Sequence, residues 1–158
     1  MLELIPAHDP QHLDSVRTLF HEYAESLGIN LHFQDFDREL ATLPGAYAPP
    51  GGTLLLARWQ GKLAGCVALR PLAGETAELK RLYVRPDSRG HGVGVALAQA
   101  AIAAARQARY AAIRLDTLPT MQAAQALYRA IGFREIPAYR YNPIPGTVFM
   151  QLDLTANG

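Results

Sequence analysis

The stretch that decides the fold is ELKRLYVRPDSRGHGVG, residues 78–94. Its first seven residues predict a strand, and an apolar helix begins near Val93. Between them, glycines let the backbone turn with positive φ and let a ligand approach without a Cβ in the way. Because the first N–H groups of a helix have no partner inside it, they attract phosphate groups. Residues 78–94 therefore predict an anion-binding loop between a strand and a helix.

The spacing of the glycines excludes two common phosphate-binding motifs. A dinucleotide fingerprint needs glycines at its first, third and sixth positions, but counting from Gly90 or Gly92 puts valine or leucine at the sixth. A P-loop needs Lys and then Ser or Thr after its last glycine, whereas Gly94 is followed by valine and alanine. Neither a Rossmann dinucleotide site nor a P-loop fits.

What remains is the pattern Arg-x-x-Gly-x-Gly, formed by Arg89, Gly92 and Gly94. Here the chain resembles the GNAT superfamily of acyl-CoA-dependent N-acyltransferases, whose pyrophosphate loop has the same spacing. The resemblance continues in a short helix downstream, where Met121 replaces the family's usual Asn. The matching positions of that region are Ala124, Leu127, Tyr128, Gly132 and Phe133. The resemblance is close over residues 75–133 and extends to the rest only as architecture.

This resemblance implies an α/β (α+β) fold, in which helices flank a mixed, mostly antiparallel central sheet in the order β-α-α-β-β-β-α-β-α-β-β. Sequence periodicity gives the same order. Strands are predicted at 2–6, 53–59, 63–71, 77–84, 111–117, 134–141 and 147–154, and helices at 10–27, 33–43, 93–108 and 121–131. Asp9 is predicted to cap the first helix and Gly28 to end it. Residues 44–52, rich in proline and glycine, predict a surface loop.

Length and composition predict one domain over residues 1–158, because a chain of 158 residues with 49% hydrophobic content can bury one substantial core. The net charge of +1 gives no basic field, so neither nucleic acid nor a membrane is expected as a partner. Because the N-terminus lacks a signal-peptide pattern, we expect a cytoplasmic protein. The oligomeric state stays open, a homodimer included.

Cysteine and histidine predict neither a disulfide nor a metal site. Cys66 is the single cysteine, and its place in an alternating apolar run predicts an inert buried thiol. His8 and His12 straddle a proline, while His21 and His32 have no carboxylate or cysteine at ligand spacing. We therefore expect no metal.

The resemblance implies acetyl-CoA as the cosubstrate. It also implies that the strand before the glycine loop splays from its neighbour, which leaves backbone groups free to pair with the pantetheine arm and to polarise the thioester carbonyl. Arg89 either reaches a phosphate, orders the loop or is a surface charge, and His91 is expected to face solvent. The predicted cofactor-binding residues are Leu82, Tyr83, Val84, Arg89, Gly90, His91, Gly92, Val93, Gly94 and Tyr128.

Acyl transfer from a thioester to an amine needs a base for the amine and an acid for the leaving thiolate. Tyr128 matches the family's usual acid, and its alternative is a core aromatic of an amphipathic helix. Glu78 lies where some members carry a base, provided that partial burial raises its pKa toward neutrality. Its alternatives are a solvated strand-end residue or a partner of Lys80 or Arg81.

The acceptor is expected to be the primary amine of a small molecule, an amino acid or a peptide. The family binds it between the first two helices and the final hairpin, which here gives the candidates Tyr23, Phe33, Tyr139, Arg140 and Tyr141. Arg140 could pair with an acceptor carboxylate, while Tyr139 and Tyr141 share a face of the predicted strand and are alternatively core residues. A second class of function stays open, a CoA-binding regulatory protein without turnover, for which Met121 is the only hint.

Overall fold

The computed structural model describes residues 1–28 and 35–154. The strands are β1 (Leu2–Pro6), β2 (Thr53–Trp59), β3 (Lys62–Ala73), β4 (Thr76–Val84), β5 (Ala112–Thr117), β6 (Arg134–Ile136) and β7 (Val148–Asp153). The α-helices are α1 (Pro10–Leu27), α2 (Phe36–Ala41), α3 (Val93–Gln107) and α4 (Gln122–Ile131). The predicted order of strands and helices is confirmed.

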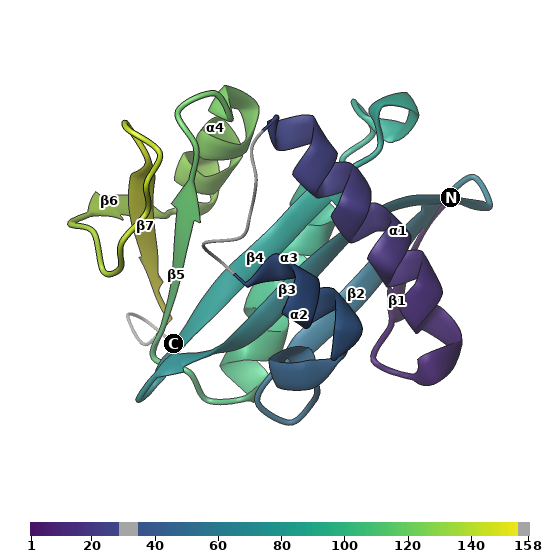
Figure 1. Cartoon of the computed structure of the whole chain (residues 1–158), viewed down its shortest axis with the longest axis horizontal. Helices are drawn as coiled ribbons and strands as arrows, with labels where there is room; N and C mark the ends of the chain where they lie inside the picture. Colours follow the sequence, from purple (N-terminus) through teal and green to yellow (C-terminus); the bar gives the residue numbers. More distant parts are fainter. Residues whose placement is uncertain (29–34, 155–158) are drawn as a thin grey trace.

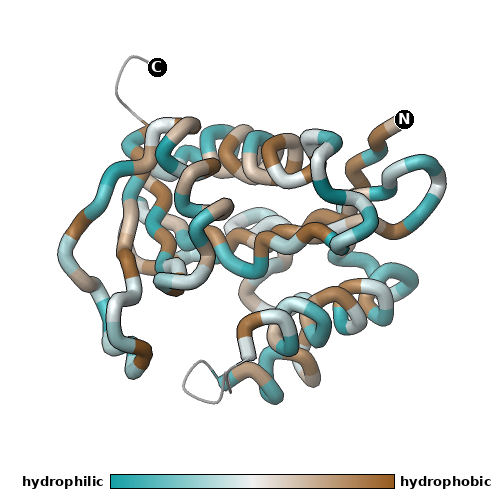
Figure 2. The backbone as a smooth tube through the Cα atoms, turned by 90° about the horizontal axis from the view of Figure 1, so that it is seen from above, coloured by the Kyte–Doolittle hydropathy of each residue, from teal (hydrophilic) through white to brown (hydrophobic). Residues whose placement is uncertain are grey.

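The strands form one sheet with the spatial order β1-β2-β3-β4-β5-β7-β6. All neighbouring pairs are antiparallel except β4 and β5, which are parallel. Figure 1 shows α1 and α2 in front of the sheet and α3 behind it. Figure 2 shows the same layers from above. The mixed, mostly antiparallel sheet flanked by helices is therefore also confirmed.

A hydrophobic cluster lies on each face of the sheet. Towards α1 and α2, the buried residues of α1 include Leu13, Val16 and Phe20, which are three and four positions apart and so share one side of the helix. Towards α3, Leu97 and Ala101 have the same spacing. The alanines of α3 are small, which lets this helix approach the strands closely.

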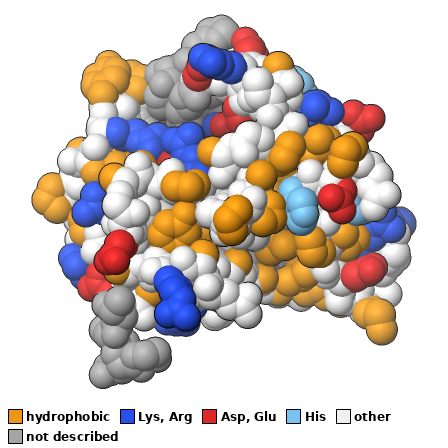
Figure 3. Space-filling model, turned by 90° about the horizontal axis from the view of Figure 1, so that it is seen from below, with side chains coloured by type: hydrophobic (Ala, Val, Ile, Leu, Met, Phe, Trp, Pro, Cys, Tyr) orange, Lys and Arg blue, Asp and Glu red, His pale blue; other side chains and the backbone are white. Residues whose placement is uncertain are grey.

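The surface shows no broad field of one charge on the face seen from below. There, neutral and apolar side chains cover most of the area, and Lys and Arg side chains gather in one region at the upper left (Figure 3). Over the described residues 1–28 and 35–154, no helix is long and apolar enough to cross a membrane.

The strand predicted at 134–141 is wrong beyond its first residues, because β6 ends at Ile136. Pro137 follows, and proline has no N–H to donate to a neighbouring strand. Residues 137–147 form an irregular connection to β7. Tyr139 and Tyr141 therefore do not share a strand face, and Tyr141 is 79% exposed.

Two smaller expectations near the N-terminal helices also changed. The segment 44–52 is not only a surface loop, because it contains a 3-10 turn whose Tyr47 is buried edge-on against Phe20, with ring centroids 6.2 Å apart. Asp9 precedes α1 but makes no side-chain capping bond, whereas Gly28 ends the helix in the left-handed conformation as predicted. The helix predicted at 33–43 is seen as α2 (Phe36–Ala41), and its expected start lies outside the described residues.

A bulge interrupts the pairing of β3 with β4. Ala68 lies opposite Lys80, and Cys66, two residues earlier, lies opposite Tyr83, so β4 contains one extra residue. Arg81 at this bulge has φ 62°, a left-handed conformation that is uncommon for any residue other than glycine. Because side chains alternate along a strand, the extra residue reverses which face the following side chains occupy.

Gly65 on β3 is the position where the backbones come too close for any side chain. A Cβ placed there would lie 2.4 Å from the carbonyl oxygen of Tyr83 and 3.2 Å from a Leu97 methyl group. This contact, which could not be predicted from the sequence, keeps β4 close to β3 just after the bulge.

We predict that Gly65→Ala destabilises the fold by about 2 kcal/mol or more, because relieving the overlap requires backbone movement in the core. Urea unfolding measures this loss. Gly94→Ala is the matched control, since a Cβ there meets its neighbours at ordinary distances of 3.5 and 3.6 Å. Equal stability of the two variants would show that β3 and β4 can separate without cost.

Candidate active site

The site begins where β4 and β5 separate. The two strands pair only at their first residues, with Thr76, Ala77 and Glu78 opposite Ala112, Ile113 and Arg114. In Figure 1 they lie side by side near the C-terminus and diverge towards α4. The predicted splay is therefore present, and among the described residues it leaves one edge of β4 without a strand partner from Leu79 to Val84.

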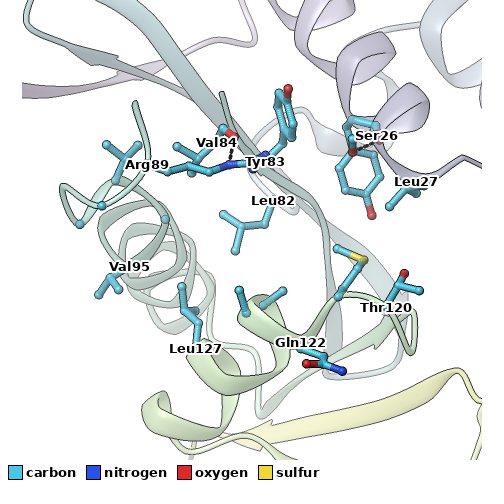
Figure 4. Close-up of a pocket in the computed structure, with 18 residues that line it drawn as sticks. Ser26, Leu27, Leu82, Tyr83, Val84, Arg89, Val95, Thr120, Gln122 and Leu127 are labelled. Atoms are coloured by element: carbon cyan, nitrogen blue, oxygen red, sulfur yellow. Dashed lines mark hydrogen bonds between the residues drawn. The ribbon is translucent and has the colours of Figure 1, made fainter. Parts of the chain in front are cut away.

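A cleft of about 650 Å³ occupies this opening. Figure 4 shows Leu82 pointing into it from β4, Leu127 from α4, and Ser26 and Leu27 at the end of α1. The other cleft residues come from α1, from β4, from the glycine loop with the start of α3, and from the start of α4 with the residues before it: Tyr23, Tyr83, Val84, Arg89, Gly90, Gly92, Val93, Gly94, Val95, Thr120, Met121, Gln122, Ala123 and Ala124. The cleft thus connects the glycine loop to the point where the strands part.

The glycine loop has the geometry expected of an anion site. Gly90 and Gly92 have φ values of 84° and 79°, which only glycine adopts readily, and Gly92 is the residue before α3. Arg89 donates from Nε to the carbonyl oxygen of Val84 at 3.0 Å, so it ties the loop to the end of β4. His91 is exposed and stacks on Trp59 with ring centroids 4.8 Å apart, and it is not among the cleft-lining residues.

Tyr128 lies behind the cleft. It is buried against Phe133, and burial raises the pKa of its phenol, so it holds its proton at neutral pH. A small cavity of about 20 Å³ lies beside it, lined by Tyr23, Leu79, Lys80, Arg81, Leu82, Asp116, Thr117, Met121 and Tyr128. Tyr23, Leu82 and Met121 line both spaces, so the cavity adjoins the cleft.

Glu78 is completely buried in a cluster of charged and polar groups. Arg70 donates to its Oε1 from Nε at 3.0 Å and from a terminal nitrogen at 2.9 Å. Tyr139 donates its hydroxyl to Oε2 at 2.6 Å, and Arg140 donates to the same oxygen. Burial alone would raise the pKa of Glu78, but the charge of Lys80, the Tyr139 hydrogen bond and both arginines outweigh it and lower the pKa.

The expectation that burial brings the pKa of Glu78 towards neutrality is therefore wrong in direction. The hydrogen-bond donors to its carboxylate also differ from the partners expected on the same strand, because they include Arg70 on β3 and Tyr139 and Arg140 after β6. The assignment of Glu78 as a base stays a prediction. A carboxylate held this firmly ionised is a weak proton acceptor at neutral pH.

The acceptor candidates are dispersed. Tyr23 lines both the cleft and the small cavity, whereas Tyr139 and Arg140 are bonded to Glu78. Tyr141 points to solvent, and Phe33 lies outside the described residues. The role of these residues in binding an acceptor stays a prediction.

Sequence reasoning missed the residues of the small cavity, Lys80 above all. Burial first, and then the positive charge of Arg81, lower the pKa of Lys80 to about 7 against the opposing charge of Glu78. The sequence contained one sign of this buried site, because Lys80 is a charged residue in the middle of a strand that had to be buried on both faces. Thr117 and Asp116, at the end of β5, showed no such signal.

Cys66 is buried, and its thiol donates to the carbonyl oxygen of Arg81 at 3.3 Å. Burial raises the pKa of this thiol, which confirms the inert thiol predicted from the sequence. Within residues 1–28 and 35–154, no group of three or more His, Cys, Asp or Glu side chains is placed to hold a metal ion.

A mixed sheet whose strands β4 and β5 splay beside a glycine loop is the arrangement that the sequence resemblance implied. The family model described as the acetyltransferase (GNAT) family matches residues 13–133. The chain therefore belongs to the GNAT acetyltransferase family and is an N-acetyltransferase.

Relatives and solved structures agree with this assignment. An uncharacterised N-acetyltransferase of Schizosaccharomyces pombe is 43% identical over 148 residues, which cover 92% of this chain and 91% of that protein. N-acetylaspartate synthetase of Danio rerio is 32% identical over 68% of this chain, a match that spans only 39% of that enzyme. The structure of an acetyltransferase from Salmonella typhimurium with its cofactor acetyl-CoA superposes with a TM-score of 0.72, at 22% identity over 96% of this chain and 93% of that one.

We predict that acid removes the contribution of Glu78 to stability. Its folded pKa is lowered from 4.5, so this contribution is present above about pH 4.5 and is lost as pH falls through the folded pKa. Glu78→Gln should cost about 1.5–3 kcal/mol at pH 7, because charge-assisted hydrogen bonds are lost, and less at lower pH. Urea midpoints at pH 7 and pH 3.5 measure the difference.

The exposed Glu3→Gln is the control, for which we expect little change at either pH. A penalty for Glu78→Gln that is as large at pH 3.5 as at pH 7 would contradict the lowered pKa.

Proposed function

We propose that the protein transfers the acetyl group of acetyl-CoA to the primary amine of a small molecule, an amino acid or a peptide, by direct attack of the amine on the thioester. The observation that carries this proposal is the cleft of about 650 Å³ that joins the glycine loop to the opening between β4 and β5. An extended phosphorylated thioester can lie along such a cleft with its reactive end at the opening.

The glycine loop is proposed to hold the pyrophosphate. The start of α3 lines the cleft, the first N–H groups of a helix have no partner within it, and the side chains absent from Gly90, Gly92 and Gly94 leave room for phosphate oxygens. Arg89 already bonds to Val84 through Nε, which leaves its terminal nitrogens available to a phosphate. Among the predicted contacts, His91 is the least supported, because its ring stacks on Trp59.

The exposed edge of β4 is proposed to bind the pantetheine arm and to polarise the thioester carbonyl through backbone groups near Leu82 and Val84. The amine nitrogen attacks the carbonyl carbon, the carbon–sulfur bond breaks, and the sulfur leaves as a thiolate. Tyr128 is proposed to protonate that thiolate. It lines the small cavity that adjoins the cleft.

We propose further that the acceptor carries a carboxylate. Arg70, Lys80 and Arg140 place three basic groups around one carboxylate, that of Glu78, and both arginine side chains are partly exposed. The second support is the relative N-acetylaspartate synthetase, whose name implies an acidic amino acid. The net charge of +1 offers no broad field for a polyanionic partner.

The test is release of free thiol from acetyl-CoA with a pooled set of amines. We expect wild type to release thiol only when an amine is present, and Tyr128→Phe to lower kcat about ten-fold or more with similar CoA affinity. Wild type that binds CoA but never releases thiol would instead be a CoA-binding regulatory protein. An unchanged kcat in Tyr128→Phe would leave this tyrosine as a packing residue.

Amino acids and their amides in the same pool test the carboxylate. We expect wild type to prefer the acid, and Arg140→Gln to raise KM for the acid about ten-fold or more while leaving KM for acetyl-CoA unchanged. Equal use of acid and amide by wild type would reject the carboxylate and leave acetyl transfer standing.

We also predict that CoA stabilises the fold, because the glycine loop exists only in the folded chain. At about one hundred times Kd, CoA should add about 2.7 kcal/mol, or roughly 5–10 °C in Tm. Gly92→Glu should abolish this shift by placing negative charge against the pyrophosphate. Gly61→Glu, in the exposed turn between β2 and β3, is the control that keeps the shift. A shift with ATP or NAD but none with CoA would contradict the proposed cofactor.

A further inference from the structure

We propose that Lys80 accepts the proton of the acceptor amine, through a water molecule held in the small cavity between Lys80, Thr117 and Tyr128. This inference rests on the proposed acetyl transfer and assigns a catalytic group that sequence reasoning placed at Glu78. Lys80 lies on β4 between Glu78 and the cleft residue Leu82.

Geometry is the first support. The cavity lined by Lys80 also contains Tyr128, the proposed acid, and it shares Tyr23, Leu82 and Met121 with the cleft. A group in this cavity therefore lies next to the cleft, which occupies the opening between β4 and β5. Glu78 lines neither the cleft nor the cavity.

Thr117 provides a second, independent observation. Its side chain is 3% exposed and lines the cavity, and its Oγ1 has no hydrogen-bond partner within residues 1–28 and 35–154. A buried hydroxyl without a partner is costly, and an ordered water molecule is the usual remedy. The cavity of about 20 Å³ has room for about one water, with Thr117, Asp116 and Lys80 around it.

The surroundings of Lys80 favour its neutral form. Burial disfavours its charge, as do the positive charges of Arg81, Arg70 and Arg140, and the carboxylate of Glu78 opposes them. The titratable and charged groups that face it come from every neighbouring element: Glu78 and Arg81 on β4, Arg70 on β3, Asp116 on β5, Tyr23 on α1, Tyr128 on α4 and Arg140 before β7. A neutral amine near pH 7 can take a proton, which the arginines cannot.

The proton balance closes without any further reactant. The acceptor ammonium gives one proton to the water, and the water gives one to Nζ of Lys80, so the amine becomes a nucleophile. The carbon–nitrogen bond forms and the carbon–sulfur bond breaks. Tyr128 protonates the thiolate and regains a proton from the acylated nitrogen. Lys80 afterwards returns its proton to solvent.

Titration of the lysine side chains tests the proposal directly, because Lys62 and Lys80 are the only lysines of the sequence. With 13C-labelled lysine, two Cε signals are expected in the NMR spectrum of the apo protein. The Lys80 signal should titrate near pH 7, and it is assigned as the signal that remains in Lys62→Met. A midpoint above pH 9 for Lys80 would overturn the proposal, because the side chain would then always be charged at neutral pH.

Turnover gives the second test. In wild type, kcat should rise with pH through about 7, whereas a Glu78 base would place that rise below about pH 4.5. Lys80→Met and Lys80→Arg should both lower kcat at least ten-fold and remove the rise, with the thermal shift by CoA preserved as evidence of folding. Lys62→Met is the matched control and should keep wild-type kinetics.

The size of the loss should depend on the acceptor. An amine with a pKa below 7 arrives without its proton, so Lys80→Met should lower its turnover far less than that of an alkyl amine. Recovery of activity by Lys80→Arg would mean that only positive charge is needed, which overturns the proposal. Wild type that releases no thiol with any amine would overturn acetyl transfer and this inference together, whereas fully active Lys80 variants would overturn this inference alone.

Discussion

The site depends on the ion pair between Arg81 and Glu39. Arg81 has the left-handed conformation at the bulge of β4, a conformation that costs about 1–2 kcal/mol. Its guanidinium forms two parallel hydrogen bonds of 2.9 Å to Glu39 on α2 and lies over the rings of Phe36 and Tyr23. Contacts from α1 and α2 therefore hold the Arg81 side chain in place, and they offset the cost of its left-handed backbone conformation.

The bulge determines what each face of β4 presents. Before it, Leu79 faces the cluster under α3, and Glu78 lies on the opposite face with Arg70. After it, Leu82 and Val84 join the cluster under α3, next to the cleft. Without the extra residue, the face under α3 would receive Arg81 and Tyr83 in place of Leu82 and Val84. One extra residue thus places the backbone of β4 against the cleft and leaves Lys80 beside the small cavity.

The sequence predicted the order of elements and the glycine loop, because each rests on local periodicity or on a spaced motif, whereas the splay was expected only from the family resemblance. It could not predict the environment of Glu78, whose partners come from another strand and from residues 61 and 62 positions later. The bulge was equally invisible, since Arg81 is not glycine and strand alternation would put Lys80 and Arg81 on opposite faces. Pro137, in contrast, was a readable sign that the strand starting at Arg134 ends early.

The charges around Glu78 couple the two proposed roles of this region. Three basic side chains surround one carboxylate, so the cluster carries an excess of positive charge in a poorly hydrated place. Lys80 is the basic member that can relieve this excess by losing its proton, because a guanidinium keeps its own. An acceptor carboxylate beside Arg140 would bring negative charge and raise the pKa of Lys80. Binding of an acidic acceptor would therefore favour transfer of its ammonium proton to Lys80, and by linkage a protonated Lys80 would hold that acceptor more tightly.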